Sequence, residues 1–308
     1  MLIPTLLGLS LFIFFAVRFL PGDVVDQMLA DFGPTDPAYR AVLEERFELG
    51  NWDAYPKQYV EWLGEILRGD FGESFFTNRP ISDALQSRLP VTFQLGAMAM
   101  ILSAFIAVPI GVVSAVWQDS FSDYVLRSFA ITLIALPSFW LGLIAIVFGF
   151  QWFGWVPPIR FEYLWDDPIT NMQILWIPTL ILAGSLSGSV MRYTRSTMLE
   201  VLRQDYVRTA RAKGLAERNV IVKHGLRNAI LPVVTVIGLQ TGILIGGTVV
   251  LETIFSLPGI GTYLFDAISG RDYPVVQAVT LIVAVVVIGV NVIVDLSYAF
   301  IDPRIKYN

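Results

Sequence analysis

The sequence predicts an all-α membrane protein with six transmembrane helices. Of the 308 residues, 55% are hydrophobic and only 15% are charged, which is far from the balance of a soluble globular domain. Long uncharged stretches recur along the chain, and they lack the alternation of a membrane β-barrel. Buried helices of a soluble protein have apolar stretches of only about 10 to 14 residues.

Six uncharged stretches are long enough for such spans, because a transmembrane helix needs about 20 mostly apolar residues. Residues 1–17 carry no charge, and stretches of 30, 32, 24, 24 and 22 uncharged residues follow between Arg88 and Asp295. The first stretch lacks the basic start and small-residue exit of a cleaved signal peptide, so it is expected to remain as a span. We expect spans at residues 1–20, 91–117, 128–153, 173–191, 229–251 and 274–300.

The charges of the connecting segments predict the orientation of the chain. Residues 192–228 hold nine Lys and Arg against three acidic residues, whereas residues 21–90 hold 13 acidic and six basic residues. Since Lys and Arg are retained on the cytoplasmic side, residues 192–228 are expected inside. Alternation then places both ends, including the tail 301–308, in the cytoplasm, and it places residues 21–90 and 252–273 outside. The outer loop 21–90 has apolar residues at helical spacing, so we expect a helical subdomain there.

Several kinds of chemistry are excluded by composition. The chain has no Cys and a single His, which rules out disulfides, thiol nucleophiles and a His-rich metal site. It has no phosphate-binding loop, so nucleotide energy would have to be bound by another chain. We find no constellation of catalytic side chains at one membrane depth, and we expect no catalytic residues and no metal.

The basic segment 192–228 has the pattern of two helices joined by a glycine turn. Gly214 interrupts the pattern, and a second segment leads to Pro232, where the next span is expected to begin. Before the glycine, apolar residues recur at helical spacing and predict an amphipathic helix over residues 199–213, with its apolar face at Leu199, Leu202, Tyr206, Val207 and Ala210.

A basic helix pair of this kind has three physical interpretations. It could lie on anionic lipid headgroups, or it could dock into a groove of a soluble cytoplasmic partner. Nucleic-acid binding requires a third helix and free access to a groove, which spans at both ends of the segment would prevent. The residues alone leave the lipid and the partner interpretations open.

A likeness to a known family favours the partner. The positions before Gly214 read RTARAK and are followed by HGLRNAILP, which resembles the E-A-A-x-x-x-G loop of ABC importer permeases. Arg208 and Thr209 stand where that pattern has Glu and its first Ala. The stretches LLGLSLFIFFAVRFLPGD and ETIFSLPGIGTYLFDAISGRDYPVVQA resemble the dipeptide and oligopeptide branch of these permeases.

The resemblance implies a type I ABC importer permease fold in the cytoplasmic (inner) membrane. It implies three kinds of protein partner: a second homologous permease in a heterodimer, two cytoplasmic ATPase subunits that bind ATP and Mg, and an extracytoplasmic solute-binding protein. The chain itself is expected to bind the lipid bilayer, no cofactor and no nucleic acid. The expected cargo is dipeptides or oligopeptides, with nickel or oligosaccharides as alternatives. A secondary transporter without an ATPase is the alternative from another class, but it should carry several ionisable residues deep in its spans.

The resemblance also assigns a coupling helix, seated in a cleft of one ATPase. Its apolar face, Leu202, Tyr206, Val207 and Ala210, is expected to make the contact. The whole ATPase-coupling loop comprises Leu202, Tyr206, Val207, Arg208, Thr209, Ala210, Arg211, Ala212, Lys213, Gly214 and Leu215.

Two further groups of residues are predicted from their positions in the spans and outer loop. Polar residues inside spans usually face protein or a cavity, which makes Gln240 and Asn291 candidates for lining the pathway. Glu252, Phe255 and Asp272 are candidates for the outer gate or for docking. Glycines spaced by four residues, as at Gly184–Gly188, Gly238–Gly242 and Gly242–Gly246, predict close approach of helices.

Overall fold

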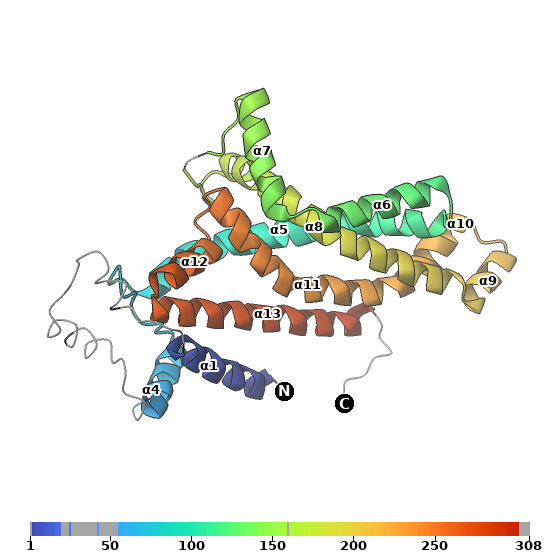
Figure 1. The fold of residues 1–308 in the computed structure, drawn as a ribbon. Coiled ribbons are helices and arrows are strands. Elements are labelled where there is room, and N and C mark those ends of the chain that lie inside the picture. Colours follow the sequence, from blue (N-terminus) through green and yellow to red (C-terminus); the bar gives the residue numbers. More distant parts are fainter. Residues whose placement is uncertain (1, 20–24, 26–41, 43–54, 159, 302–308) are drawn as a thin grey trace. The chain divides into compact units, whose positions relative to one another are not determined.

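The computed structural model describes residues 2–19, 25, 42, 55–158 and 160–301, and nearly all of them are helical (Figure 1). The only β-pairing among these residues is an isolated bridge between Glu73 and Pro80. The all-α class is therefore confirmed. Of the predicted outer-loop subdomain 21–90, the structure describes residues 25, 42 and 55–90, and residues 55–90 include one whole helix and the start of the next. The helices are α1 (Leu2–Arg18), α4 (Tyr55–Leu67), α5 (Ile81–Val116), α6 (Phe121–Ala135), α7 (Ser138–Phe153), α8 (Pro168–Leu202), α9 (Asp205–Ala212), α10 (Glu217–Asn219), the π-helix η2 (Val220–Leu226), α11 (Arg227–Ile254), α12 (Ile260–Gly270) and α13 (Tyr273–Ile301).

Four described helical stretches are long and apolar enough to cross a membrane. They are α5, α8, the continuous run Glu217–Ile254, and Tyr273–Val294 within α13. A fifth is formed if α6 and α7 count as one span, although they are bent by 91° with respect to one another. α1 is apolar but has only 17 residues.

The break between α6 and α7 corrects the prediction of one continuous helix over residues 128–153. Leu136 has an extended conformation (φ −80°, ψ 121°), and Pro137 follows it. A proline has no backbone N–H to donate, and its ring disfavours helical geometry in the preceding residue. The apolar composition of this stretch is continuous, but its helix is not.

The chain folds into two compact units. Unit 1 comprises Met1–Pro90 and Gly259–Ile288, and unit 2 comprises Val91–Pro258 and Gly289–Asn308, so α5 and α13 contribute to both. In unit 1, the Tyr59 and Trp62 rings on α4 pack against Phe14 of α1, with ring centroids 5.4 and 5.6 Å from the Phe14 ring. The buried core of unit 1 joins α5, α12 and α13 through Ile81, Leu85, Ile260, Ala267, Val275, Ala278 and Val279.

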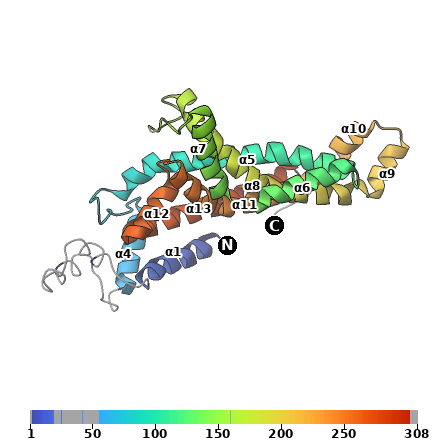
Figure 2. The ribbon, with the colours of Figure 1, turned by 45° about the horizontal axis from the view of Figure 1, so that its top comes forward.

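Unit 2 is built around α8, which packs against α6 and α11 (Figures 1 and 2). A Cβ at Gly188 of α8 would lie 2.5 Å from the Ala130 carbonyl oxygen of α6, and one at Gly238 of α11 would lie 2.5 Å from Val294 of α13. The predicted close approach is confirmed at these two glycines. Gly242 and Gly246 face open space.

α8 is longer than the predicted span 173–191. Asp167 caps its N-terminus by accepting hydrogen bonds from the backbone N–H groups of Ile169 and Thr170, and Pro168 occupies the first turn. The helix then continues past Arg192 and Arg195 to Leu202. The edge of an uncharged stretch marks where the apolar surface ends and gives no sign of where the helix ends.

Candidate functional site

Residues 203–226, between α8 and α11, lie within the basic segment 192–228 that was predicted to hold the coupling loop, and we call them the 203–226 segment. α8 ends at Leu202, and Gln204 is extended (φ −70°, ψ 149°), so α9 is a separate short helix. The single amphipathic helix predicted over residues 199–213 is therefore wrong. The last turn of α8 supplies its first residues, and the extended Gln204 separates them from α9.

Gly214 makes the turn between α9 and α10. Its φ is +77°, a left-handed conformation that is costly for residues with a Cβ. A Cβ built at Gly214 meets nothing within 4 Å. The requirement for glycine at this position is therefore conformational and does not come from packing.

The apolar face of α9 packs inside the protein. Val207 is 0% exposed and Ala210 is 5% exposed, and they form one buried cluster with Val220 of η2, against which Leu202 of α8 packs. The expectation that this face docks on a partner is wrong for Val207 and Ala210, because a side chain already buried in its own chain offers no docking surface. These contacts instead attach α9 to the ends of its neighbouring helices.

Tyr206 strengthens this attachment with polar contacts. Its hydroxyl donates to the backbone oxygen of His224 (3.3 Å) and accepts from Nδ2 of Asn228 (3.0 Å). The ring itself remains 44% exposed. Tyr206 therefore joins α9 to η2 and α11 while one side stays accessible.

An ion pair spans the Gly214 turn. Arg211 donates from Nη2 to Oε1 of Glu217 at 2.7 Å, and its Nε makes two further contacts of 3.2 Å. The hydrogen bonds to Glu217 raise the pKa of Arg211 above its ordinary value, so the guanidinium stays charged. Because both side chains are exposed, the pair contributes at most about 1 kcal/mol, and its main effect is on the shape of the turn.

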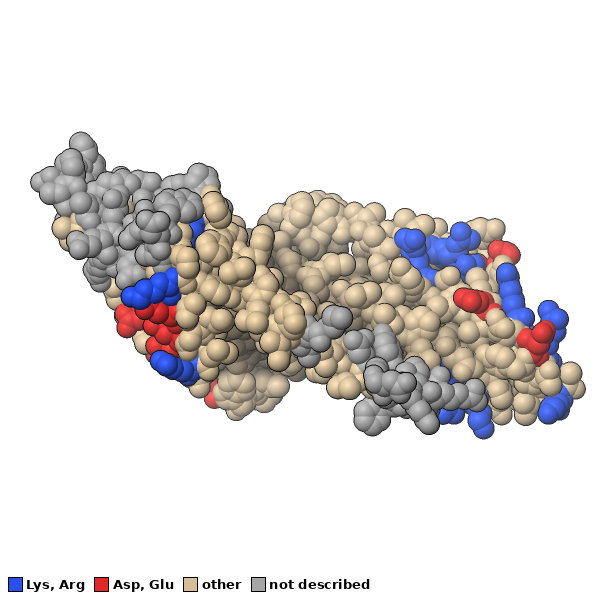
Figure 3. All heavy atoms as spheres, turned by 90° about the horizontal axis from the view of Figure 1, so that it is seen from below, with Lys and Arg blue, Asp and Glu red and all other residues tan. Residues whose placement is uncertain are grey.

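The remaining surface of the segment is basic. Leu215 is the accessible apolar side chain next to the turn, at 42% exposed. Figure 3 shows Lys and Arg gathered with a few acidic residues at the end of unit 2 that carries α9 and α10. The exposed residues of the predicted coupling loop are Tyr206, Arg208, Thr209, Arg211, Ala212, Lys213, Gly214 and Leu215.

Sequence reasoning missed a buried ion pair close to this segment. Asp123 at the start of α6 is fully buried, and its carboxylate receives two hydrogen bonds from Arg195 of α8, at 2.8 and 2.6 Å. The sequence gives only a weak indication of this ion pair, since it shows one acidic residue after a turn and one Arg just beyond the end of an apolar stretch.

Three of the predicted pathway and gate residues of unit 2, Gln240, Glu252 and Phe255, are buried. Gln240 is buried on α11, and its Nε2 has no hydrogen-bond partner among the described residues. Asn291 is half-buried on α13. Glu252 is fully buried and accepts a hydrogen bond from Thr92 Oγ1 (2.5 Å), and Phe255 belongs to the apolar core.

Asp272 has a structural environment in unit 1. It is buried, and its carboxylate accepts from Ser74 Oγ (2.6 Å) and from the backbone N–H of Phe75 (3.1 Å). Docking requires an accessible side chain, so the docking role predicted for Glu252, Phe255 and Asp272 is not compatible with their burial. A gate role for them stays a prediction.

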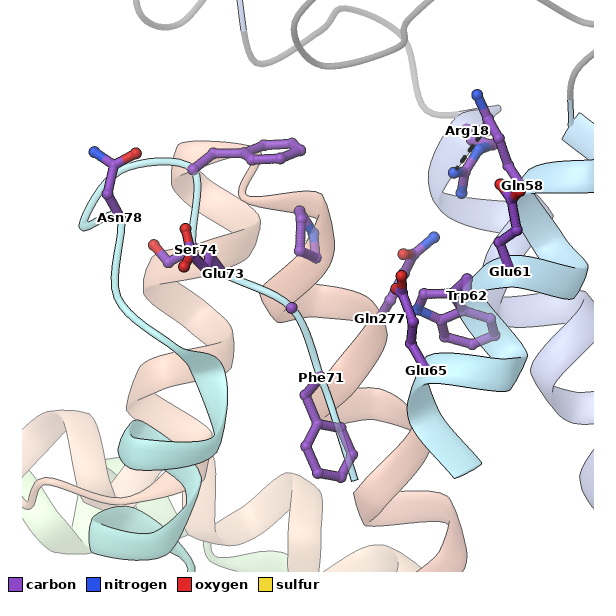
Figure 4. Close-up of a pocket in the computed structure, with 13 residues that line it drawn as sticks. Arg18, Gln58, Glu61, Trp62, Glu65, Phe71, Glu73, Ser74, Asn78 and Gln277 are labelled. Carbon is purple, nitrogen blue, oxygen red and sulfur yellow. Dashed lines mark hydrogen bonds between the residues drawn. The ribbon is translucent and has the colours of Figure 1, made fainter. Parts of the chain in front are cut away.

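Unit 1 also contains a pocket of about 480 Å³ that sequence reasoning did not single out (Figure 4). The carboxylates of Glu61, Glu65 and Glu73 line it, with Trp62 and Gln277 between them. The lining comes from α1, α4, the segment before α5 and the start of α13. Residues so far apart in the chain share no sequence pattern that would group them.

Proteins of known name resemble this chain over its whole length, and one family model matches a large part of it. The family described as "Binding-protein-dependent transport system inner membrane component" matches residues 107–307. Dipeptide transport system permease protein DppB of Alkalihalophilus pseudofirmus is 41% identical over 327 residues, which cover 100% of this chain and 97% of the relative. Oligopeptide transport system permease protein AppB of Bacillus subtilis is 41% identical over 312 residues, with the same coverage. Glutathione transport system permease protein GsiC of Salmonella typhi is 39% identical and covers 99% of this chain and 96% of its own.

A solved structure supports the fold. A chain of the MetNI methionine ABC transporter, in an inward-facing conformation, matches with a TM-score of 0.58 at 15% identity, over 71% of this chain and 96% of that chain. The expected type I importer permease fold is thereby confirmed. From this match, the family profile and the full-length relatives, we conclude that the chain belongs to the binding-protein-dependent transport system inner membrane components, which are multi-pass permease subunits of ABC importers.

Proposed function

We propose that this permease forms half of the translocation pathway of an importer for dipeptides or oligopeptides. The observation that carries the proposal is the 41% identity to a dipeptide permease and to an oligopeptide permease across 100% of this chain. A third relative is named for glutathione, which is itself a small peptide. These relatives favour peptides over the nickel and oligosaccharide alternatives.

The partners follow from the way such an importer works. The chain has no phosphate-binding loop, so ATP and Mg would be bound by two separate ATPase subunits. A second, homologous permease would complete the pathway as a heterodimer. A solute-binding protein on the outer side would deliver the peptide and so determine which peptides are taken up.

The orientation rests on charge. The nine Lys and Arg of residues 192–228 favour a cytoplasmic position for the 203–226 segment. Both ends of the chain would then lie in the cytoplasm, while the acidic loop 21–90 and the loop 252–273 would lie outside. In this orientation the accessible surface of α9 faces the ATPase subunits.

The structure favours a revised docking surface for the 203–226 segment. Val207 and Ala210 attach α9 to its own chain, which leaves Tyr206, Leu215 and the basic residues between them to contact the ATPase. A short helix fixed to the ends of α8 and α11 would pass ATPase closure to both helices as a rigid-body movement.

Reconstitution of the complete importer into proteoliposomes tests the proposal. We expect uptake of a labelled dipeptide or tetrapeptide that needs the binding protein outside and ATP on the side of the ATPases. ADP in place of ATP should abolish uptake. Unlabelled peptide should compete with the labelled peptide for uptake, whereas nickel and oligosaccharides should not. Uptake that proceeds without the ATPase subunits, or uptake of nickel or oligosaccharide in place of peptide, would overturn it.

A further inference from the structure

The buried carboxylate of Asp123 holds three parts of unit 2 together. It accepts four hydrogen bonds: two from Arg195 of α8, one from Ser114 Oγ of α5, and one from the backbone N–H of Asp119 in the turn between α5 and α6. Asp123 is also fixed from its own side, because its backbone N–H donates to the capping hydroxyl of Ser120. Every acceptor position of the carboxylate is thus used, and its orientation is fixed.

Such a pair is better suited to fixing geometry than to adding stability. A buried ion pair is usually no more stabilising than apolar side chains of similar volume. Apolar contacts, however, allow helices to slide and rotate slightly, whereas the two directional bonds between Arg195 and Asp123 fix both the distance and the rotation of α8 relative to α6.

A packed path leads from this pair to α9. Met198 lies one turn after Arg195 and is fully buried with Ala115 of α5 and Ala229 of α11. Leu202, one further turn along, contacts this cluster and also packs against the cluster of Val207, Ala210 and Val220, which anchors α9. Arg195 is therefore only about 10 Å along the helix axis from the end of α8.

We propose that Asp123 and Arg195 are positioning residues for energy coupling. The pair holds α5, α6 and α8 as one rigid body at the end where the 203–226 segment is attached. Movement of that segment therefore moves all three helices together, and α8 does not move alone. This inference rests on the proposed function, because it presumes that the segment receives its movement from an ATPase.

Replacing both charges together tests this role without leaving one of them buried and unpaired. In the complete importer, Asp123→Leu combined with Arg195→Met should assemble with the ATPases and keep their basal hydrolysis rate. The stimulation of hydrolysis by peptide-loaded binding protein, and the peptide imported per ATP hydrolysed, should fall by about fivefold or more. Arg195→Lys keeps the positive charge but not the paired N–H donors. It should lower the stimulation of hydrolysis and the peptide imported per ATP less than the double variant does.

The chain offers a matched control at the other end of α8. Gln94 of α5 and Asn171 of α8 form a partly buried pair of amide hydrogen bonds, at 2.5 and 3.3 Å, about 36 Å along the helix from Arg195. Gln94→Leu combined with Asn171→Leu removes a comparable polar bridge between helices. This variant should have a lower thermal stability, but the amount of peptide imported per ATP hydrolysed should be unchanged.

Two results would overturn the proposal. One is a double variant at Asp123 and Arg195 that couples as well as the unmodified importer. The other is an equal loss of coupling in the control at Gln94 and Asn171, which would mean that general stability is responsible. If the unmodified complex showed no stimulation by the binding protein, the failure would lie with the proposed function itself.

Discussion

Gly214 is the residue whose backbone sets the direction of the 203–226 segment. Its φ of +77° costs a residue with a Cβ about 1 kcal/mol, although nothing lies within 4 Å of the added atom. Gly214→Ala should therefore distort the turn and weaken docking of the ATPase by about fivefold. The measurement is the amount of ATPase recovered per permease after affinity purification.

Gly64→Ala is the control for this substitution. Gly64 lies within α4, where an added Cβ also meets nothing within 4 Å and where no positive φ is involved. ATPase recovery from this variant should equal that of the unmodified protein. Equal recovery from the Gly214 and Gly64 variants would mean that the turn has no part in docking.

Individual residues were predictable from the sequence where their role is local. Gly214 could be assigned to a turn because glycine interrupts a helical pattern. The burial of Val207 and Ala210 within their own chain could not be predicted. An apolar stripe indicates that one face of a helix is covered, but it does not indicate whether the same chain or a partner covers it. The pair of Asp123 and Arg195 joins residues 72 positions apart, and a single charge on each helix carries no information about its partner.

At the scale of helices, the contact between α6 and α8 depends on a residue without a side chain. An added Cβ at Gly188 would lie 2.5 Å from the backbone oxygen of Ala130, and backbone cannot move aside as a flexible side chain can. Gly188→Ala should therefore separate the two helices and cost about 1 to 3 kcal/mol. We expect a lower midpoint of thermal unfolding in detergent.

Gly184 provides the comparison, since it lies one turn earlier on the same helix. Its added Cβ would meet Leu133 at 3.6 Å, which is an ordinary contact. Gly184→Ala should leave the midpoint unchanged or raise it, because alanine favours a helix more than glycine does. A Gly188 variant as stable as the Gly184 variant would contradict the described packing of α6 on α8.

The sequence predicted which stretches of the chain are helical better than it predicted where the helices end. Runs without charge reveal apolar surface, and most of them correspond to long helices. They did not reveal that α8 continues through Arg192 and Arg195, because a helix can leave an apolar environment without ending. Pro137 was visible in the sequence, but whether a proline kinks or breaks a helix depends on the packing around it. Pro232, by contrast, lies inside α11.

At the scale of the whole molecule, composition was enough to predict an all-α membrane protein, and charge asymmetry was enough to propose its orientation. Neither could choose between a lipid surface and a protein partner for the 203–226 segment, because both favour a basic amphipathic helix. The likeness of RTARAKGL to the loop of importer permeases favoured a protein partner. The structure adds that the buried side of α9 serves attachment, so we propose that the partner contacts the opposite side.

The central claim, that this opposite side of α9 docks on an ATPase, can be tested by cross-linking. The chain contains no Cys, so Leu215→Cys creates a unique site for a short photoreactive cross-linker. Val60→Cys, on α4 in the loop proposed to lie outside, is a control with comparable access, since Val60 is also exposed. In the assembled importer, residue 215 should cross-link to the ATPase and residue 60 should not. Absence of an ATPase cross-link from residue 215 in a complex that still imports peptide would contradict the account.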